Sequence, residues 1–214
     1  MCLQNYLKFN EGNEVPKLYT LWSGLICLSV AISRKVMIDR GQFRIYPNMF
    51  VLLAGDSGNR KTSGRDIAKK LILDAIPDVI LSANQETRQG ITNFMQSKMQ
   101  IRTFSPREGE LIEYHPLAIL CGELANYVAL DPAGMITFLT DIYDNEDYLY
   151  RLKNEQHFLH NPYVTMLACA VPTWITSQVK ATTFCEGFGR RAIFVCDDSD
   201  IRIDEPFMTL EGIA

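Results

Sequence analysis

One segment near position 55 constrains the fold of this chain more than any other. The apolar run at residues 49–54 leads into Gly55-Asp56-Ser57-Gly58-Asn59-Arg60-Lys61-Thr62, and residues 63–76 follow with the pattern of a helix. A glycine-rich turn at a helix N-terminus gathers backbone N–H groups that suit anionic oxygens. A strand, this loop and a helix in that order predict a phosphate-binding loop in an α/β domain.

The loop residues have different expected tasks. We expect Lys61 to reach the β- and γ-phosphates of a nucleotide and the Thr62 hydroxyl to ligate Mg²⁺. Arg60 stands where glycine is usual, so we expect Gly58 to supply the backbone freedom. The predicted nucleotide-binding residues of this segment are Gly55, Asp56, Ser57, Gly58, Asn59, Arg60, Lys61, Thr62 and Ser63. A glycine-rich turn that binds no phosphate is the alternative.

Composition limits the class of protein. The 214 residues suffice for one α/β domain, and 47% hydrophobic with 21% charged residues is typical of a globular chain. A net charge of −4 argues against a generally basic nucleic-acid-binding module, although not against a local basic patch. The six cysteines form no CxxC pair and have no metal-ligand spacing with the three histidines, which favours reduced thiols.

One apolar stretch, residues 18–32, invites comparison with a membrane segment or a signal peptide. It falls short of a spanning length and contains polar residues, and the segment before it is acidic rather than basic. We therefore expect a buried helix over about residues 16–34, no membrane partner and a cytoplasmic location.

Hydrophobic patterns along the chain alternate between strands and helices. Further strands are expected at 79–83, 116–121, 163–170 and 191–196, and helices at 63–76, 87–99, 133–143 and 172–180. Hairpins are expected at 36–46 and 101–114, and an extended segment at 148–153. The alternation predicts a mainly parallel sheet with helices on both faces, an N-terminal helix and β-hairpin insertions. We predict one domain, in which residues 1–47 pack on a core of residues 48–214.

A carboxylate follows the apolar run at 116–121. Glu123 stands where a phosphate-loop hydrolase needs an acid, and we expect it to polarise the attacking water and to hold Mg²⁺ through water. Gly122 precedes it, where an Asp on the magnesium side is common. Metal binding need not be lost, because Thr62 and phosphate oxygens remain as ligands. A polar turn that merely begins at Glu123 is the alternative.

Two arginines follow paired glycines in Gly187-Phe188-Gly189-Arg190-Arg191, immediately before the last expected strand. The guanidinium is always charged and can stabilise a transferring phosphoryl group, often across a subunit boundary. We expect Arg191 or Arg190 in this role, with surface salt bridges as the alternative.

The order of these motifs resembles the phosphate-loop ATPase domains of phage, prophage and mobile-element replication proteins, a helicase-like family often fused to primases. The resemblance runs from Trp22 to about Val195 and is carried by YPNMFVLLAGDSGNRKTS, LAILCGELANYV, FLTDIYDNEDY, NPYVTMLACAVPTWI and GFGRRAIFV. It implies ATP and Mg²⁺ as cofactors and homo-oligomeric rings, such as hexamers, that move on single-stranded DNA. It also implies a primase or polymerase partner and, for a phage-encoded chain, a bacterial host.

The resemblance assigns residues as well. Lys61, Thr62, Glu123 and Arg191 fall on motif positions of the family, and an Arg before the lysine is typical of the group. Asn161 matches an Asn-Pro pair at which a polar sensor of the γ-phosphate can act. A turn that begins before the next strand is the other interpretation of Asn161.

A nucleic-acid contact is expected at residues 148–160, which interleave basic and aromatic side chains. Cations follow the phosphates of a single strand and aromatic rings stack on its bases. We predict Tyr150, Arg151, Lys153 and His157 as the contacting residues of a hairpin in a ring channel. An ordinary amphipathic strand with a solvated turn is the alternative, and the hairpin at 101–114, with Arg102 and Arg107, is the rival channel loop.

Three functional classes follow. The first is an ATP-driven helicase-like motor of DNA replication. The second is a nucleotide-binding regulatory or assembly ATPase with weak hydrolysis, which Gly122 keeps open. The third is a small nucleotide kinase, for which no acceptor-site pattern is evident.

Overall fold

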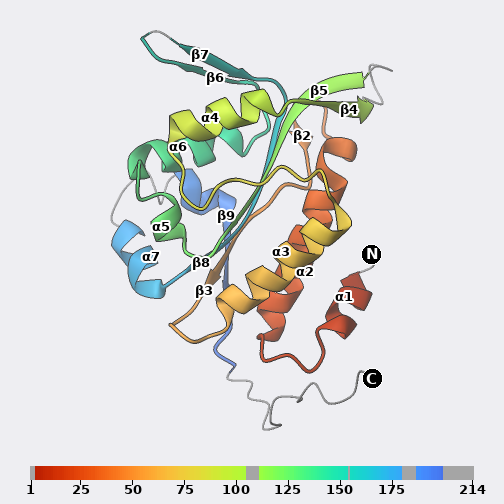
Figure 1. The fold of residues 1–214 in the computed structure, drawn as a ribbon, viewed down its shortest axis with the longest axis vertical. Helices are drawn as coiled ribbons and strands as arrows, with labels where there is room; N and C mark the ends of the chain where they lie inside the picture. Colours follow the sequence, from red (N-terminus) through yellow and green to blue (C-terminus); the bar gives the residue numbers. More distant parts are fainter. Residues whose placement is uncertain (1–2, 105–110, 154, 180–186, 200–214) are drawn as a thin grey trace, which may run out of the picture.

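Five strands form the central sheet in a computed structural model that describes residues 3–104, 111–153, 155–179 and 187–199 (Figure 1). The strand order is β4-β5-β8-β3-β9, with four parallel strands and the antiparallel β4 at one edge. The strands are β3 (Phe50–Ala54), β4 (Gln100–Phe104), β5 (Leu111–Cys121), β8 (Pro162–Ala170) and β9 (Ala192–Cys196). The expected α/β class with a mainly parallel sheet is confirmed.

Helices cover both faces of this sheet, also as expected (Figure 1). One face carries α1 (Leu3–Phe9), α2 (Lys17–Ile32) and α3 (Lys61–Ala75), and a short 3-10 turn, Ser33–Lys35, follows α2. The other face carries α4 (Arg88–Ser97), α5 (Leu124–Tyr127), α6 (Pro132–Ile142), α7 (Pro172–Val179) and the short α8 (Gly189–Arg191). The helix expected at about 16–34 is therefore present, and it packs against α3.

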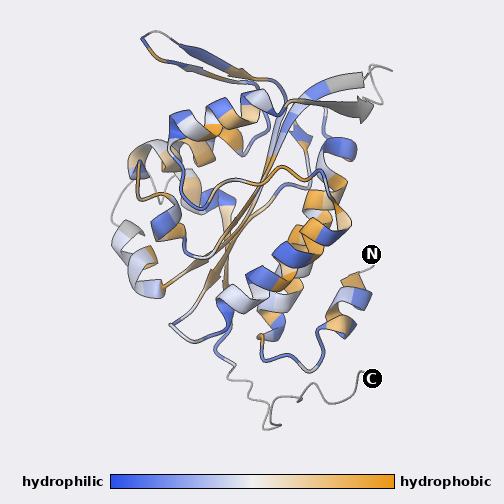
Figure 2. Cartoon of the chain, viewed as in Figure 1, coloured by the Kyte–Doolittle hydropathy of each residue, from blue (hydrophilic) through white to orange (hydrophobic). Residues whose placement is uncertain are grey.

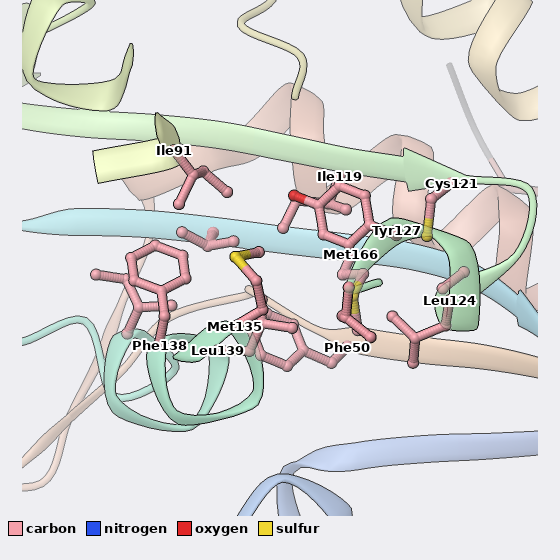
Figure 3. Close-up of a cluster of buried hydrophobic side chains, with 14 of the residues drawn as sticks. Phe50, Ile91, Ile119, Cys121, Leu124, Tyr127, Met135, Phe138, Leu139 and Met166 are labelled. Carbon is pink, nitrogen blue, oxygen red and sulfur yellow. The ribbon is translucent and has the colours of Figure 1, made fainter. Parts of the chain in front are cut away.

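The alternation of side chains along β3 explains this arrangement. Phe50 and Leu52 belong to the hydrophobic cluster beneath α4 and α6, whereas Val51 and Leu53 belong to the cluster beneath α2 and α3. Figure 3 shows the first cluster, in which Phe50 and Met166 of the sheet meet Met135 of α6. A strand that is buried on both faces must be apolar at every position, which is why its sequence shows no polar alternation.

Two further pairs of strands extend from the body. The hairpin of β1 (Ile38–Asp39) and β2 (Arg44–Ile45) occurs within the expected residues 36–46. The hairpin of β6 (Tyr148–Arg151) and β7 (Gln156–Leu159) projects beyond α4 and is hydrophilic over much of its surface (Figures 1 and 2). Strands β4 and β5 form the third expected hairpin, whose turn at 105–110 lies outside the described residues.

One expected strand is reduced to a single bridge. Of residues 79–83, only Leu81 forms a bridge, parallel to Ala118 of β5. The same edge of β5 is used by β4, whose partners run from Leu111 to Tyr114. The expectation of a full strand was wrong: this segment forms one parallel bridge at Ala118, while β4 pairs with an earlier stretch of β5.

The described cysteines are not paired with one another. Cys27, Cys121 and Cys169 are buried and free, as expected for reduced core thiols, whereas Cys196 is exposed. Within the described ranges, no helix combines the length and apolar character needed to cross a membrane.

Candidate functional site

The loop 55–62 lies at the edge of the sheet where all four parallel strands end. Ala54 of β3 is in register with Ala170 of β8 and with Cys196 of β9, and Cys121 of β5 is in register with Ala168. Ligands of open parallel sheets bind at this carboxyl edge. The position of the loop is therefore the one at which a nucleotide site is expected.

Lys61 is folded back into the loop. Its buried Nζ donates hydrogen bonds to the carbonyl oxygens of Gly55 at 2.5 Å and of Asp56 at 2.6 Å. The ammonium group is thus held on the inner side of the turn at the N-terminus of α3. An anionic oxygen that entered the loop would meet this charge together with the helix N-terminus.

Arg60 adopts the left-handed conformation, with φ of 51°, and Gly58 has φ of 90°. A left-handed conformation costs a non-glycine residue about 1–2 kcal/mol. The Arg60 guanidinium forms an ion pair with Glu14, so the side chain leaves the loop rather than entering it. Glu14 lies 46 residues away in the sequence, and no local signal there points to the loop.

Helix α2 and the segment after β9 both contact the loop through hydrogen bonds. Tyr19 Oη of α2 donates to the carbonyl oxygen of Ala54 at 2.8 Å, and Asn59 Nδ2 contacts Tyr19 Oη at 3.2 Å and the Asp197 carbonyl oxygen at 2.7 Å. A Cβ on Gly55 would lie 2.6 Å from Tyr19 Oη, so this position requires glycine. Neither Tyr19 nor Asp197 was predicted from the sequence.

A cleft of about 610 Å³ opens beside the start of α3. The cleft is lined by the exposed Thr62 and by Glu123, which comes one residue after Gly122 at the end of β5. The structure therefore brings these two predicted residues together. The complete lining is Thr62, Arg65, Asn84, Gln85, Cys121, Gly122, Glu123 and Asn126.

Burial and nearby positive charge act on the pKa of the Glu123 carboxylate in opposite directions. Burial raises its pKa above the ordinary value, while the charge of Lys61 and a hydrogen bond from the Val171 backbone oppose this shift. Its Oε1 is buried and has no hydrogen-bond partner among the residues that the structure describes. A carboxyl group in this state can accept a proton or hold an ordered water.

Glu123 Oε1 is also suited to the predicted Mg²⁺ site. Mg²⁺ keeps several waters and needs few protein ligands, so the Thr62 hydroxyl and a water held by Glu123 suit it. The described parts of the chain contain no group of three or more His, Cys, Asp or Glu side chains able to hold a metal.

Asn161 is not brought to this cleft. It precedes β8, whose other end reaches the loop, and nine extended residues span about 30 Å. Its Oδ1 accepts from Arg34 Nη2 at 2.9 Å and its Nδ2 donates to the Glu113 carbonyl oxygen at 3.0 Å. The expectation that it senses a γ-phosphate in its own subunit is corrected, and its φ of 45° agrees with the turn interpretation.

Arg190 and Arg191 also lie at the opposite edge. They immediately precede β9, whose first residue, Ala192, is in register with Phe50 at the start of β3. Arg191 Nη2 contacts the Asp144 carboxylate at 2.7 Å. Neither arginine can reach loop 55–62 of its own chain in this arrangement.

The predicted nucleic-acid residues divide between two faces of the β6–β7 hairpin. His157 is buried, its Nδ1 lies 3.1 Å from Gln96 Oε1, and the ring of Tyr150 lies beneath the guanidinium of Arg88 at 4.4 Å. Arg151 and Lys153 are exposed. Tyr150 and His157 therefore pack toward α4, and only the two basic residues are open to a partner.

For the rival hairpin, the structure describes the backbone at Arg102 but not its side chain, and Arg107 lies outside the described residues.

Comparison with protein-family models and with curated proteins finds no match to this chain.

Proposed function

We propose that this chain is an ATP-hydrolysing, helicase-like motor domain that acts on DNA during replication of a phage or mobile element. The observation that carries the proposal is the meeting of Lys61, Thr62 and Glu123 at the carboxyl edge of the parallel sheet. DNA is proposed as the substrate because the order of the motifs resembles that of replication ATPases.

The proposed hydrolysis forms no covalent bond between the nucleotide and the protein. The Glu123 carboxylate takes a proton from water as the water oxygen bonds to the γ-phosphorus, and the bond to the bridging oxygen of ADP breaks. Lys61 exchanges its two carbonyl contacts for phosphate oxygens and balances their charge. Mg²⁺, when bound, would shield the β- and γ-phosphate oxygens, and Thr62 and Glu123 are the residues that would hold it.

The position of Arg191 supports the proposal that the chain assembles into oligomers. An arginine at the far edge of the sheet can reach phosphate only in a neighbouring copy of the chain, so a site completed by Arg191 is shared between subunits. A homo-oligomeric ring, with hexamers as the form implied by the family, satisfies this requirement. The exposed Arg151 and Lys153 of the hairpin are the basic side chains that this proposal directs at single-stranded DNA.

A second function, a nucleotide-gated assembly subunit with weak hydrolysis, is favoured by one observation. Gly122 supplies no acid beside Glu123, and the guanidinium of Arg65 lies against Gly122. A cation where an acid is usual disfavours a divalent metal and thereby slows turnover.

The experiment that tests the proposal measures steady-state ATP hydrolysis with and without single-stranded DNA. We expect stimulation by DNA that is absent from Lys61→Ala and retained by Lys70→Ala, an exposed lysine on the same helix. Negligible hydrolysis with ATP still bound would support the assembly subunit instead. Absence of any nucleotide binding would overturn both functions.

A further inference from the structure

We propose that Arg65 is a further phosphate-contacting residue of the cleft, directed at the terminal phosphate of a nucleoside triphosphate, and that Gly122 makes room for it. The inference deepens the proposed nucleotide-binding function and rests on it. Two features of the structure carry it: Arg65 lines the cleft and has one donor, Nε, without a partner among the described residues, and its guanidinium fills the space that a side chain at position 122 would need.

Arg65 shares a helix face with the two residues that define the loop. It follows Lys61 by four positions and Thr62 by three, so the three side chains emerge on one side of α3. The Arg65 side chain is only 13% exposed, yet it lines the cleft with Thr62 and Glu123. A long cationic side chain is therefore held inside the site rather than extended into solvent.

The contacts of the Arg65 guanidinium leave one donor, Nε, without a partner among the described residues. Nη1 lies 3.0 Å from Oδ1 of Asp66, whose side chain is 57% exposed. Nε is buried and has no hydrogen-bond partner in the part of the chain that the structure describes. A buried donor without a partner costs free energy, and an anionic oxygen in the cleft would recover it.

Gly122 and Arg65 fit one another. A Cβ at position 122 would lie 2.7 Å from Arg65 Nη2, which is closer than non-bonded atoms tolerate. The glycine at the end of β5 is thus the reason why the guanidinium can occupy this place. The position at which an acid is usual on the metal side is filled by a cation from α3.

The position of the cation determines which phosphate it meets. Thr62 and Glu123 flank Arg65 in the cleft, and Glu123 is the group placed to act on water that attacks the terminal phosphorus. The planar, permanently charged fork of arginine suits two oxygens of one phosphate. Arg65 should therefore distinguish nucleoside triphosphate from diphosphate.

The test is the affinity of the full chain for a non-hydrolysable ATP analogue and for ADP, measured by calorimetry. We expect Arg65→Ala to weaken binding of the analogue by about tenfold, the value of one charged hydrogen bond, and binding of ADP by less than about twofold. Lys70→Ala, on the same helix and exposed, should change neither affinity. Thermal melting of each variant separates loss of the contact from loss of the fold.

A second variant tests the fit. Gly122→Ala places a methyl group against Nη2, which is the far end of a flexible side chain, so the guanidinium moves and the backbone does not. We expect Gly122→Ala to lower the preference for the ATP analogue in the original chain but not in an Arg65→Ala background. Such non-additivity identifies a shared interaction.

The inference is overturned if Arg65→Ala weakens both nucleotides equally or neither, or if Gly122→Ala acts independently of Arg65. The proposed function fails differently: the original chain would bind neither nucleotide, or Lys61→Ala would bind both as well as the original chain does. The two failures are therefore distinguishable, and failure of the proposed function overturns this inference with it.

Discussion

The guanidinium of Arg191 and the carboxylate of Asp144 meet at 2.7 Å, at the edge of the sheet opposite loop 55–62. Arg191 Nη1 also donates to the carbonyl oxygen of Gly187 at 3.3 Å. The arginine is thereby held in a fixed direction before any neighbouring subunit is present. A role in phosphate chemistry would require a partner copy to take it from Asp144.

This relationship predicts the phenotype of Arg191→Ala. We expect the DNA-stimulated hydrolysis rate to fall by about 10³-fold or more, because a transition-state arginine is lost, with nucleotide affinity of the isolated subunit unchanged. Mixing Arg191→Ala chains with Lys61→Ala chains should restore part of the rate, since some interfaces then combine an intact loop with an intact arginine. A mixture as inactive as its components would contradict a shared site.

Replacement of Glu123 by Gln should separate chemistry from binding. The amide cannot take the proton of the attacking water, so we expect the hydrolysis rate to fall by about 10²- to 10⁴-fold while ATP affinity is retained. Asp74→Asn, which alters an exposed carboxylate on α3, is the matched control and should hydrolyse ATP normally. A variant that loses ATP binding as well would assign Glu123 to binding rather than to catalysis.

Acid should slow the proposed ATP hydrolysis through the same residue. Because burial raises the pKa of Glu123, its carboxylate takes up a proton at a pH above the ordinary 4.5 of glutamate. The protonated group cannot serve as a base, so the rate should fall as pH decreases through this raised pKa. A rate profile of the original chain whose acid limb lies at or below pH 4.5 would show that Glu123 is not the titrating group.

The two faces of the β6–β7 hairpin should respond differently to mutation. Neutralising Arg151 and Lys153 together should weaken single-stranded DNA binding and reduce the slope of log affinity against log salt by about 1.4, from about 0.7 per phosphate contact. Tyr150→Ala and His157→Ala should instead lower the unfolding midpoint, because these rings pack toward α4. Fluorescence anisotropy at several salt concentrations measures the first effect and thermal melting the second.

Lys70→Ala is the control for charge alone, since it removes one exposed cation at a distance from the hairpin. An equal effect of Lys70→Ala on the salt slope would show that the hairpin has no special part in DNA binding.

The stability of the fold should fall between pH 7.5 and 5.5 because of His115. This histidine is buried, its Nδ1–H donates to the His160 carbonyl oxygen at 2.9 Å, and burial lowers its pKa below 6.5. The unfolded chain then binds a proton near pH 6.5 that the folded chain resists, so acid favours unfolding, by at most about 1.4 kcal/mol per pH unit. Urea unfolding at both pH values measures the effect.

His115→Gln removes the titrating group and keeps a side chain able to donate a hydrogen bond. We expect the loss of stability in acid to be smaller in this variant than in the original chain. An unchanged pH dependence would assign the effect to other groups.

Arg34 connects several segments at the edge of the sheet opposite loop 55–62, and we expect its replacement by lysine to destabilise the fold. Its Nη1 donates to the carbonyl oxygens of Asn145 at 3.2 Å and Pro162 at 3.0 Å, its Nη2 donates to Asn161, and its guanidinium lies 4.1 Å from the centre of the Tyr46 ring. A single ammonium cannot serve these partners, so we expect Arg34→Lys to lower the free energy of unfolding by about 3 kcal/mol. Chemical denaturation measures the loss.

Arg40→Lys alters an exposed arginine of the neighbouring hairpin and should leave stability unchanged. Nucleotide affinity of Arg34→Lys should also be normal, because Arg34 and loop 55–62 lie at opposite edges. A change in affinity would reveal coupling between the edges.

Much of the fold could be predicted from the sequence, because strands buried on both faces and amphipathic helices leave local patterns. The apolar run before Gly55 and the run before Glu123 both proved to be parallel strands, and this alone brought the loop and the carboxylate to one edge. The segment at 79–83 has the same local apolar pattern but forms only a single bridge, and nothing in its own sequence marks the difference.

The rest of the site depends on tertiary contacts that carry no local signal. Tyr19 and Asp197 reach the loop from distant parts of the chain, and the Arg65 guanidinium occupies space that is free only because residue 122 is a glycine. Asn161 was placed in the site by its match to a motif, although a residue that precedes a parallel strand lies at the amino edge of the sheet, opposite loop 55–62 of its own chain.

Strand β8 connects the two edges directly. At one end the carbonyl oxygen of Ala170 accepts a hydrogen bond from the Gly55 N–H at 3.3 Å, and at the other Pro162 accepts from Arg34. All nine of its residues are buried and it is hydrogen-bonded to a strand on each side, so it cannot stretch or bend appreciably. In the motor proposed above, mechanical work at loop 55–62 would therefore reach the β6–β7 hairpin by movement of the sheet as one stiff body, and the strand axis would set the direction of that movement.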